Sequence, residues 1–154
     1  MTYLNRDATA NFLCQRLHGH THFLTVTMRP ASLALNTLDR RSQLEETVRH
    51  FLYRLSRACF KRRHRRRGLT VGSYASIETG CSGNHLHAHI TLACPPNFGY
   101  ETFEGLILSS VKRCRTLGPE MDLRPIHSTT GLAQYLSKEG QEALLPKAIQ
   151  DAKY

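Results

Sequence analysis

The fold is decided by a stretch in which polar and apolar residues alternate, His85-Leu86-His87-Ala88-His89-Ile90. Successive side chains of an extended strand point to opposite faces of its sheet. The three histidines therefore share one face, while the three apolar residues point into a core from the other. This alternation predicts a half-buried strand over residues 85–93 that carries three imidazoles on its polar face.

The residues on either side of this strand predict a regular order of elements. Residues 22–28 are rich in β-branched and aromatic side chains and predict a strand, and residues 79–84 predict a hairpin turn after a strand over 69–78. The spacing of apolar residues predicts a further strand at 120–126 and helices at 5–17, 44–59, 100–115, 128–139 and 142–153. The expected fold class is α+β, with a ferredoxin-like βαββαβ core whose antiparallel sheet carries its helices on one face.

Length and charge limit the kinds of protein this chain can be. Its 154 residues suit one domain, which we expect to cover residues 1–154. The formal net charge of +9 favours a polyanionic partner. The sequence contains no apolar run as long as a membrane span and no pattern typical of a secretory signal, so no membrane partner is expected. Five cysteines without a CxxC pair argue against a disulfide framework and favour a cytoplasmic location.

Histidines and a carboxylate are placed to form a metal site. His85 and His87 lie two residues apart on one strand, and antiparallel pairing across the hairpin is expected to bring Glu78 close to His85. Two imidazoles and one carboxylate, with positions open to substrate, suit Mn²⁺ or Mg²⁺ acting on a phosphate. His89 lies on the same face, one step further from the hairpin, and His87 with His89 is an alternative ligand pair.

A nucleophile is predicted further along the chain. Tyr135 and Lys138 are three residues apart on an expected helix and so share one of its faces. A phenol is a poor nucleophile unless a metal polarises the phosphate and a cation assists. Attack by Tyr135 would leave a covalent 5′-phosphotyrosine, which a 3′-hydroxyl can reseal, and Lys138 would steady the developing charge.

These motifs resemble those of a known family. The stretch His85-Leu86-His87 resembles the His-hydrophobic-His motif of HUH endonucleases, the initiators of rolling-circle replication. Phe23-Leu24-Thr25-Val26-Thr27 is similar to the first motif of that family, and Tyr135-Leu136-Ser137-Lys138-Glu139-Gly140 to the third, as in single-tyrosine Rep proteins. Glu78 stands where many Rep domains place a third metal ligand. The resemblance covers residues 22 to 140.

The resemblance implies a metal-dependent enzyme that nicks and rejoins DNA. Its expected partners are single-stranded or hairpin DNA at an origin or element end, and a separate host helicase, because no P-loop or helicase domain follows in this chain. A cytoplasmic location is expected for a bacterial, plasmid or phage protein, and a nuclear one for a protein of a eukaryotic virus. The single tyrosine in the third motif does not support a two-tyrosine, relaxase-like mechanism. Initiation of rolling-circle replication is the expected role, and a transposase- or mobilisation-type nickase is the alternative.

Basic residues are expected to contact the DNA backbone. They are a dense run that follows the second predicted helix and three residues in the last turn of the third: Lys61, Arg62, Arg63, Arg65, Arg66, Arg67, Lys112, Arg113 and Arg115.

Two other classes of function remain open. His89-Ile90-Thr91 and His127-Ser128-Thr129 both fit the His-x-Thr pattern of two-histidine phosphoesterases, which act on cyclic phosphates without a metal. The net charge also fits a non-catalytic module that binds nucleic acid. Sheets that bind RNA usually expose aromatic side chains for base stacking, whereas the strands here offer mostly histidine and threonine.

Overall fold

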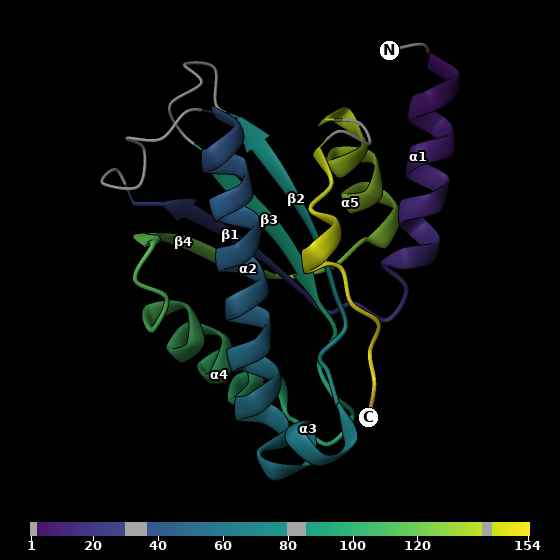
Figure 1. Ribbon diagram of the computed structural model, residues 1–154. Coiled ribbons are helices and arrows are strands. Elements are labelled where there is room, and N and C mark those ends of the chain that lie inside the picture. The colour runs from purple at the N-terminus through teal and green to yellow at the C-terminus, as the bar shows by residue number, and fades with distance from the viewer. Residues whose placement is uncertain (1–2, 30–36, 80–85, 140–142) are drawn as a thin grey trace.

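The computed structural model describes residues 3–29, 37–79, 86–139 and 143–154 (Figure 1). In chain order, its helices and strands are α1 Tyr3–Arg16, β1 His22–Met28, α2 Thr37–Phe60, α3 Arg62–Arg67, β2 Ser73–Thr79, β3 Leu86–Leu92, α4 Tyr100–Lys112, β4 Leu117–Pro125 and α5 Thr129–Leu136, with short 3₁₀ turns at Ser137–Glu139 and Pro146–Ala148. None of the helices within these ranges is long and apolar enough to cross a membrane.

The four strands form one antiparallel sheet in the order β2-β3-β1-β4. β1 pairs with β3 on one side and with β4 on the other, and β2 pairs with β3 through the hairpin that joins them. The helices α2 and α4 connect strands that are not neighbours, as in a split β-α-β arrangement. The predicted α+β fold with an antiparallel sheet is confirmed, and this strand order is that of a ferredoxin-like core.

The main core lies between the sheet and the helices α2 and α4. Alternate residues of β1, among them Leu24 and Val26, are buried on this side, as are Ala88 and Ile90 of β3. Phe51 of α2 and Phe103 of α4 are fully buried against them. Burial of this apolar surface is the principal force that holds the two helices on the sheet.

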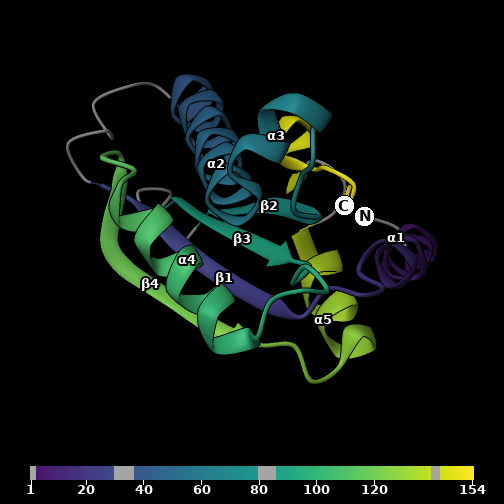
Figure 2. The same ribbon diagram turned by 90° about the horizontal axis from the view of Figure 1, so that it is seen from below.

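The opposite face of the sheet carries helices as well, although α2 and α4, the two helices of the βαββαβ core, lie on one face as predicted. Leu13 of α1, Leu17 just after it, and Ala133 and Leu136 of α5 form a smaller core with Tyr74 of β2. Figure 2 shows α1 and α5 separated from α2 by the sheet. α1 and α5 lie outside the βαββαβ unit, so their apolar stripes are free to cover the second face.

The C-terminal segment is different from the prediction of a helix over 142–153. From residue 143 onward it has a 3₁₀ turn at Pro146–Ala148 and is otherwise extended along the outer edge of β2. Ser73 and Gln150 exchange backbone hydrogen bonds of 2.9 and 3.1 Å. An edge strand has backbone groups that need partners, and this non-local demand outweighs the helix preference of the local sequence.

Candidate active site

A pocket of about 570 Å³ opens on the sheet face that α5 leaves partly uncovered. All four strands and α5 contribute side chains to it: Phe23, Thr25, Glu78, His87, His89, Asp122, Arg124, Leu132 and Tyr135. The pocket therefore joins segments far apart in the sequence, and it contains five residues of the motifs on which the resemblance rests: Phe23, Thr25, Glu78, His87 and Tyr135.

The register of the sheet explains why these side chains meet. Glu78 of β2 lies opposite His87 of β3, and Thr25 of β1 lies opposite His89. Asp122 of β4 lies opposite Thr25 on the other side of β1. Because residues paired across antiparallel strands point to the same face, the alternation of each strand delivers its polar side chains to one place.

His89 is held by contacts on both ring nitrogens and on its face. Its Nε2 lies 2.5 Å from Glu78 Oε2, and its Nδ1 lies 3.1 Å from Thr25 Oγ1. The ring of Phe23 stacks on the imidazole at a centroid distance of 5.4 Å and an angle of 18°. The hydrogen bond from His89 holds the pKa of Glu78 below its ordinary value, with the charges of His89 and His87 adding to the effect. Glu78 is therefore an ionised acceptor, so Nε2 carries the proton and, in a neutral ring, Nδ1 accepts from Thr25.

Tyr135 meets the same carboxylate from α5. Its hydroxyl donates to Glu78 Oε2 over 3.5 Å, and its ring makes an edge contact with His89 at 5.7 Å. The side chain remains 40% exposed, so the hydroxyl borders the open pocket. Ser128, at the N-terminus of α5, accepts a hydrogen bond from Gly131 N of 3.0 Å, which fixes the start of the helix.

Lys138 lies next to Tyr135, as the spacing predicts. α5 ends at Leu136, and Lys138 belongs to the following 3₁₀ turn. Its Nζ nevertheless lies 4.9 Å from the centre of the Tyr135 ring, within the range of a cation–π contact. The ammonium group therefore adds positive charge beside the phenol.

The structure changes which histidines lie beside Glu78. His85 lies outside the described residues, so the expected contact between Glu78 and His85 is not described. Glu78 instead faces His87 in register and contacts His89, which was expected one step further away. The long Glu78 side chain reaches this diagonal neighbour because adjacent strands are twisted relative to one another. His87 and His89, the alternative pair, both line the pocket.

The donor types in the pocket suit a divalent cation, although the part of the chain that the structure describes holds no ready-made group of three metal ligands. Two imidazoles and a carboxylate are the donors expected for Mn²⁺ or a similar ion. The hydrogen bond between His89 Nε2 and Glu78 Oε2 engages two of these donor atoms with each other. The donor atoms of these residues are therefore of the right kind for a divalent ion. Binding of the ion would require this hydrogen bond to break.

The predicted DNA-contacting residues are not brought to this pocket. The run from Lys61 to Arg67 forms α3, which follows α2, and Lys112, Arg113 and Arg115 lie at the end of α4. Both places belong to the sheet face opposite the pocket. The cation that lines the pocket is Arg124, whose Nε lies 2.6 Å from Asp122 Oδ2.

Several pocket residues were not predicted. The alternation of β1 and β4 could have identified Phe23, Thr25, Asp122 and Arg124, since each lies an even number of residues from its neighbour on the polar face. Their contact with the histidines depends on strand order, which local patterns do not specify. His127 of the alternative His-x-Thr pattern is exposed just before α5 and does not line the pocket.

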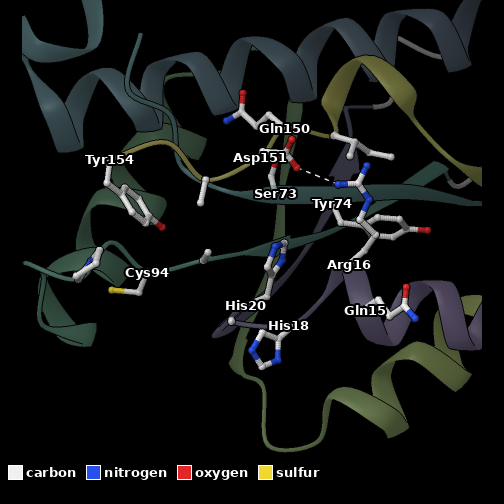
Figure 3. A pocket seen from close by; sticks show the side chains of 15 residues that line it. Gln15, Arg16, His18, His20, Ser73, Tyr74, Cys94, Gln150, Asp151 and Tyr154 are labelled. Carbon is white, nitrogen blue, oxygen red and sulfur yellow. Dashed lines mark hydrogen bonds and ion pairs between the residues drawn. The ribbon is translucent and has the colours of Figure 1, made fainter. Parts of the chain in front are cut away.

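A second cavity, of about 480 Å³, lies where α1 leads into β1 (Figure 3). His20 points into it, and its Nδ1 lies 2.6 Å from Thr91 Oγ1. Arg16 and Asp151 form an ion pair of 2.9 Å at its rim. Burial lowers the pKa of His20 to about 4, so its imidazole is neutral at physiological pH.

Comparison with known proteins leaves the family open: no family model, curated protein or solved structure matches this chain.

Proposed function

We propose that the protein is a metal-dependent endonuclease that nicks and rejoins single-stranded DNA through Tyr135. The observation that supports this most directly is the contact of the Tyr135 hydroxyl with Glu78, whose carboxylate also binds His89 in an open pocket. The resemblance to single-tyrosine HUH endonucleases points to the same residues. Initiation of rolling-circle replication is the role that this resemblance implies, with transposition or mobilisation as the alternative.

The proposed step is a transesterification in which atoms and charges balance. Tyr135 Oη forms a bond to phosphorus while the bond from phosphorus to the 3′ oxygen breaks. The phenolic proton leaves toward Glu78 Oε2, the acceptor that it already contacts, and the departing 3′ oxygen takes a proton from solvent to become a hydroxyl. The reverse reaction rejoins the strand, because the phosphotyrosine retains an activated ester.

Glu78, His87 and His89 would hold the divalent ion, either Mn²⁺ or Mg²⁺, with His85 as the ligand predicted from the sequence. When bound, the ion supplies Lewis-acid polarisation of the scissile phosphate. Thr25 and Phe23 orient His89, one through Nδ1 and the other through the ring face.

Lys138 has an electrostatic role in the proposed reaction. Its ammonium group lies against the Tyr135 ring and favours the negative charge that develops on the phenolic oxygen. Arg124, at the β4 side of the pocket, is placed to meet a phosphate of the bound strand.

A denaturing protein gel tests the proposal. The full chain is incubated with Mn²⁺ and a pool of 3′-labelled single-stranded oligonucleotides of random sequence. A labelled, slower-migrating adduct is expected, and it should disappear with chelator and with Tyr135→Phe. Tyr100→Phe is the matched control, since Tyr100 is also exposed, at 55% against 40% for Tyr135, but lies on α4, on the opposite face of the sheet. An adduct that persists in Tyr135→Phe would exclude Tyr135 as the nucleophile.

The alternative as a two-histidine phosphoesterase receives less support. Such an enzyme needs Thr91 in the pocket beside His89. Thr91 is fully buried, and its hydroxyl is engaged by His20. A non-catalytic module that binds nucleic acid would retain its binding in Tyr135→Phe and form no adduct in any variant.

A further inference from the structure

A groove lined with arginines runs between α2 and α4, on the side of the molecule away from the candidate active site. One hollow of about 340 Å³ lies between His50, Tyr53, Arg54 and Arg57 of α2 and the end of α4 at Arg113. A second hollow of about 480 Å³ shares three of these residues and continues toward Arg115. The shared lining makes the two hollows one continuous groove.

The arginines of this groove carry uncompensated charge. Among the described residues, no ion pair involves Arg54, Arg57, Arg113 or Arg115. The one carboxylate that lines the groove, Glu46, is bound to Arg49 at 2.9 Å and to Lys147 at 3.4 Å. Like charges gathered in one hollow repel one another, and a bound polyanion removes that repulsion and releases counterions.

The arrangement of the side chains suits phosphates. Arg54 Nε donates to His50 Nε2 over 2.8 Å, which orients the guanidinium group and leaves its other N–H groups for a ligand. Arg57 and Arg113 are exposed on the two walls of the groove. The ring of Tyr53 contacts His64 of α3 at 5.0 Å, so the basic residues of α3 extend the same surface.

The position of the groove indicates that it binds a different segment of nucleic acid from the pocket. α2 and α4 cover one face of the sheet, and α5 lies on the other (Figure 2). Tyr135 of α5 and the histidines line the pocket on that second face. A short single strand in the pocket would have to pass around the edge of the sheet to reach Arg57 or Arg113.

We propose that the groove between α2 and α4 is a second nucleic-acid surface, which binds the phosphate backbone of duplex DNA. Proteins that hold single strands stack bases on aromatic side chains. In this groove, the one tyrosine or phenylalanine among the described lining residues is Tyr53, and its ring already contacts His64. Arginines without aromatic side chains for base stacking suit the regularly spaced phosphates of a duplex. They would bind these phosphates whatever the base sequence.

The proposal does not depend on the nicking activity, because the groove contains none of the pocket residues. It assigns Arg113 and Arg115, which the sequence predicts to contact the DNA backbone, to a duplex rather than to the strand in the pocket. It also adds Arg54 and Arg57, which the sequence did not single out.

Duplex binding by the full chain, measured without metal, tests this inference. The probe is a fluorescein-labelled duplex of about 20 base pairs and arbitrary sequence, titrated by fluorescence polarisation at several salt concentrations. The double variant Arg57→Ala/Arg113→Ala should bind roughly tenfold more weakly, and the slope of log K against log salt should fall by about 2. Both side chains are exposed, so the variant is expected to fold.

The control removes the same charge elsewhere. Arg6→Ala/Arg16→Ala takes two exposed arginines from α1 and should change the affinity less than about twofold. Equal weakening by the two double variants would overturn the proposal, because net charge alone would then explain binding. Loss of affinity for a single strand but not for the duplex would overturn it as well. Tyr135→Phe should bind the duplex normally, so failure of the groove and failure of the nucleophile are distinguishable.

Discussion

At the scale of single residues, the pocket depends on how the His89 ring is oriented. Glu78 and Thr25 bind its two nitrogens, and Phe23 covers its face. A ring held at three points presents its nitrogen in one direction, which is what a metal ligand or a proton carrier requires. We therefore expect the proposed activity to depend on the surrounding residues as well as on the histidine itself.

Thr25→Val should reduce nicking without unfolding the protein. The substitution preserves shape but removes the hydroxyl that lies 3.1 Å from His89 Nδ1. We expect roughly a tenfold loss of adduct formation, together with a change in stability of about 1 kcal/mol. The matched control is Thr27→Val, which removes a hydroxyl bonded to the Glu120 backbone on the same strand face. Equal losses in the two variants would argue against the orienting role of Thr25.

The Mn²⁺ affinity of single-histidine variants tests which pair of histidines binds the metal, His87 with His89 or His85 with His87. Titration of Mn²⁺ followed by calorimetry should show weaker binding, by tenfold or more, in His89→Ala and in His87→Ala. A loss confined to His85→Ala and His87→Ala would instead support the pair favoured by the sequence. Unchanged Mn²⁺ affinity in all three variants would remove the metal from the proposal.

His20 should make the protein less stable in mild acid. Burial lowers its pKa from 6.5 to about 4, so between these values the folded state binds fewer protons than the unfolded state. Stability therefore falls as the pH is lowered from about 6.5 toward 4, by at most about 3 kcal/mol. His20→Asn should show a shallower decline in urea unfolding over this range, and the exposed His18→Asn should resemble the unchanged protein. A decline of the same steepness in His20→Asn would contradict this account.

At the scale of elements, β1 was predicted over its full length, whereas the C-terminal segment was not. Buried and partly exposed side chains alternate along residues 22–28, because one face of the strand packs on the core. A local sequence pattern can show such an alternation. The segment after residue 143 contains good helix-forming residues, but it lies along β2 because that edge needs partners. Which edge is free follows from the strand order, so no local pattern could identify it.

Gly72→Ala tests the packing of this C-terminal segment. A Cβ atom at Gly72 would lie 3.0 Å from Ala152 Cβ and 3.2 Å from Ala152 N, too close for ordinary contact. We expect a loss of about 1–2 kcal/mol in the free energy of unfolding. Gly105→Ala is the control, because nothing lies within 4 Å of its Cβ position in α4, and it should stabilise the protein by about 0.5–1 kcal/mol. Similar urea midpoints for the two variants would show that the segment is not packed tightly on β2.

At the scale of the whole molecule, the sheet separates two chemically different surfaces. One face carries Tyr135, Glu78 and the histidines, and the other carries Arg54 and Arg57 of α2 together with Arg113 just after α4. The sequence predicted the ferredoxin-like core, and it singled out Tyr135, Glu78, the histidines, Arg113 and Arg115, but not Arg54 and Arg57 of α2. It could not show that the basic residues face away from the pocket, because this depends on which side of the sheet α2 and α4 pack.

The central claim is that Tyr135 becomes covalently linked to DNA. The direct measurement is mass spectrometry of the adduct after nuclease and protease digestion. The account predicts a nucleotide joined through its 5′ phosphate to the peptide that contains Tyr135, formed only when Mn²⁺ or Mg²⁺ is present. A nucleotide on any other residue, or DNA cleavage with no covalent adduct under these conditions, would contradict it.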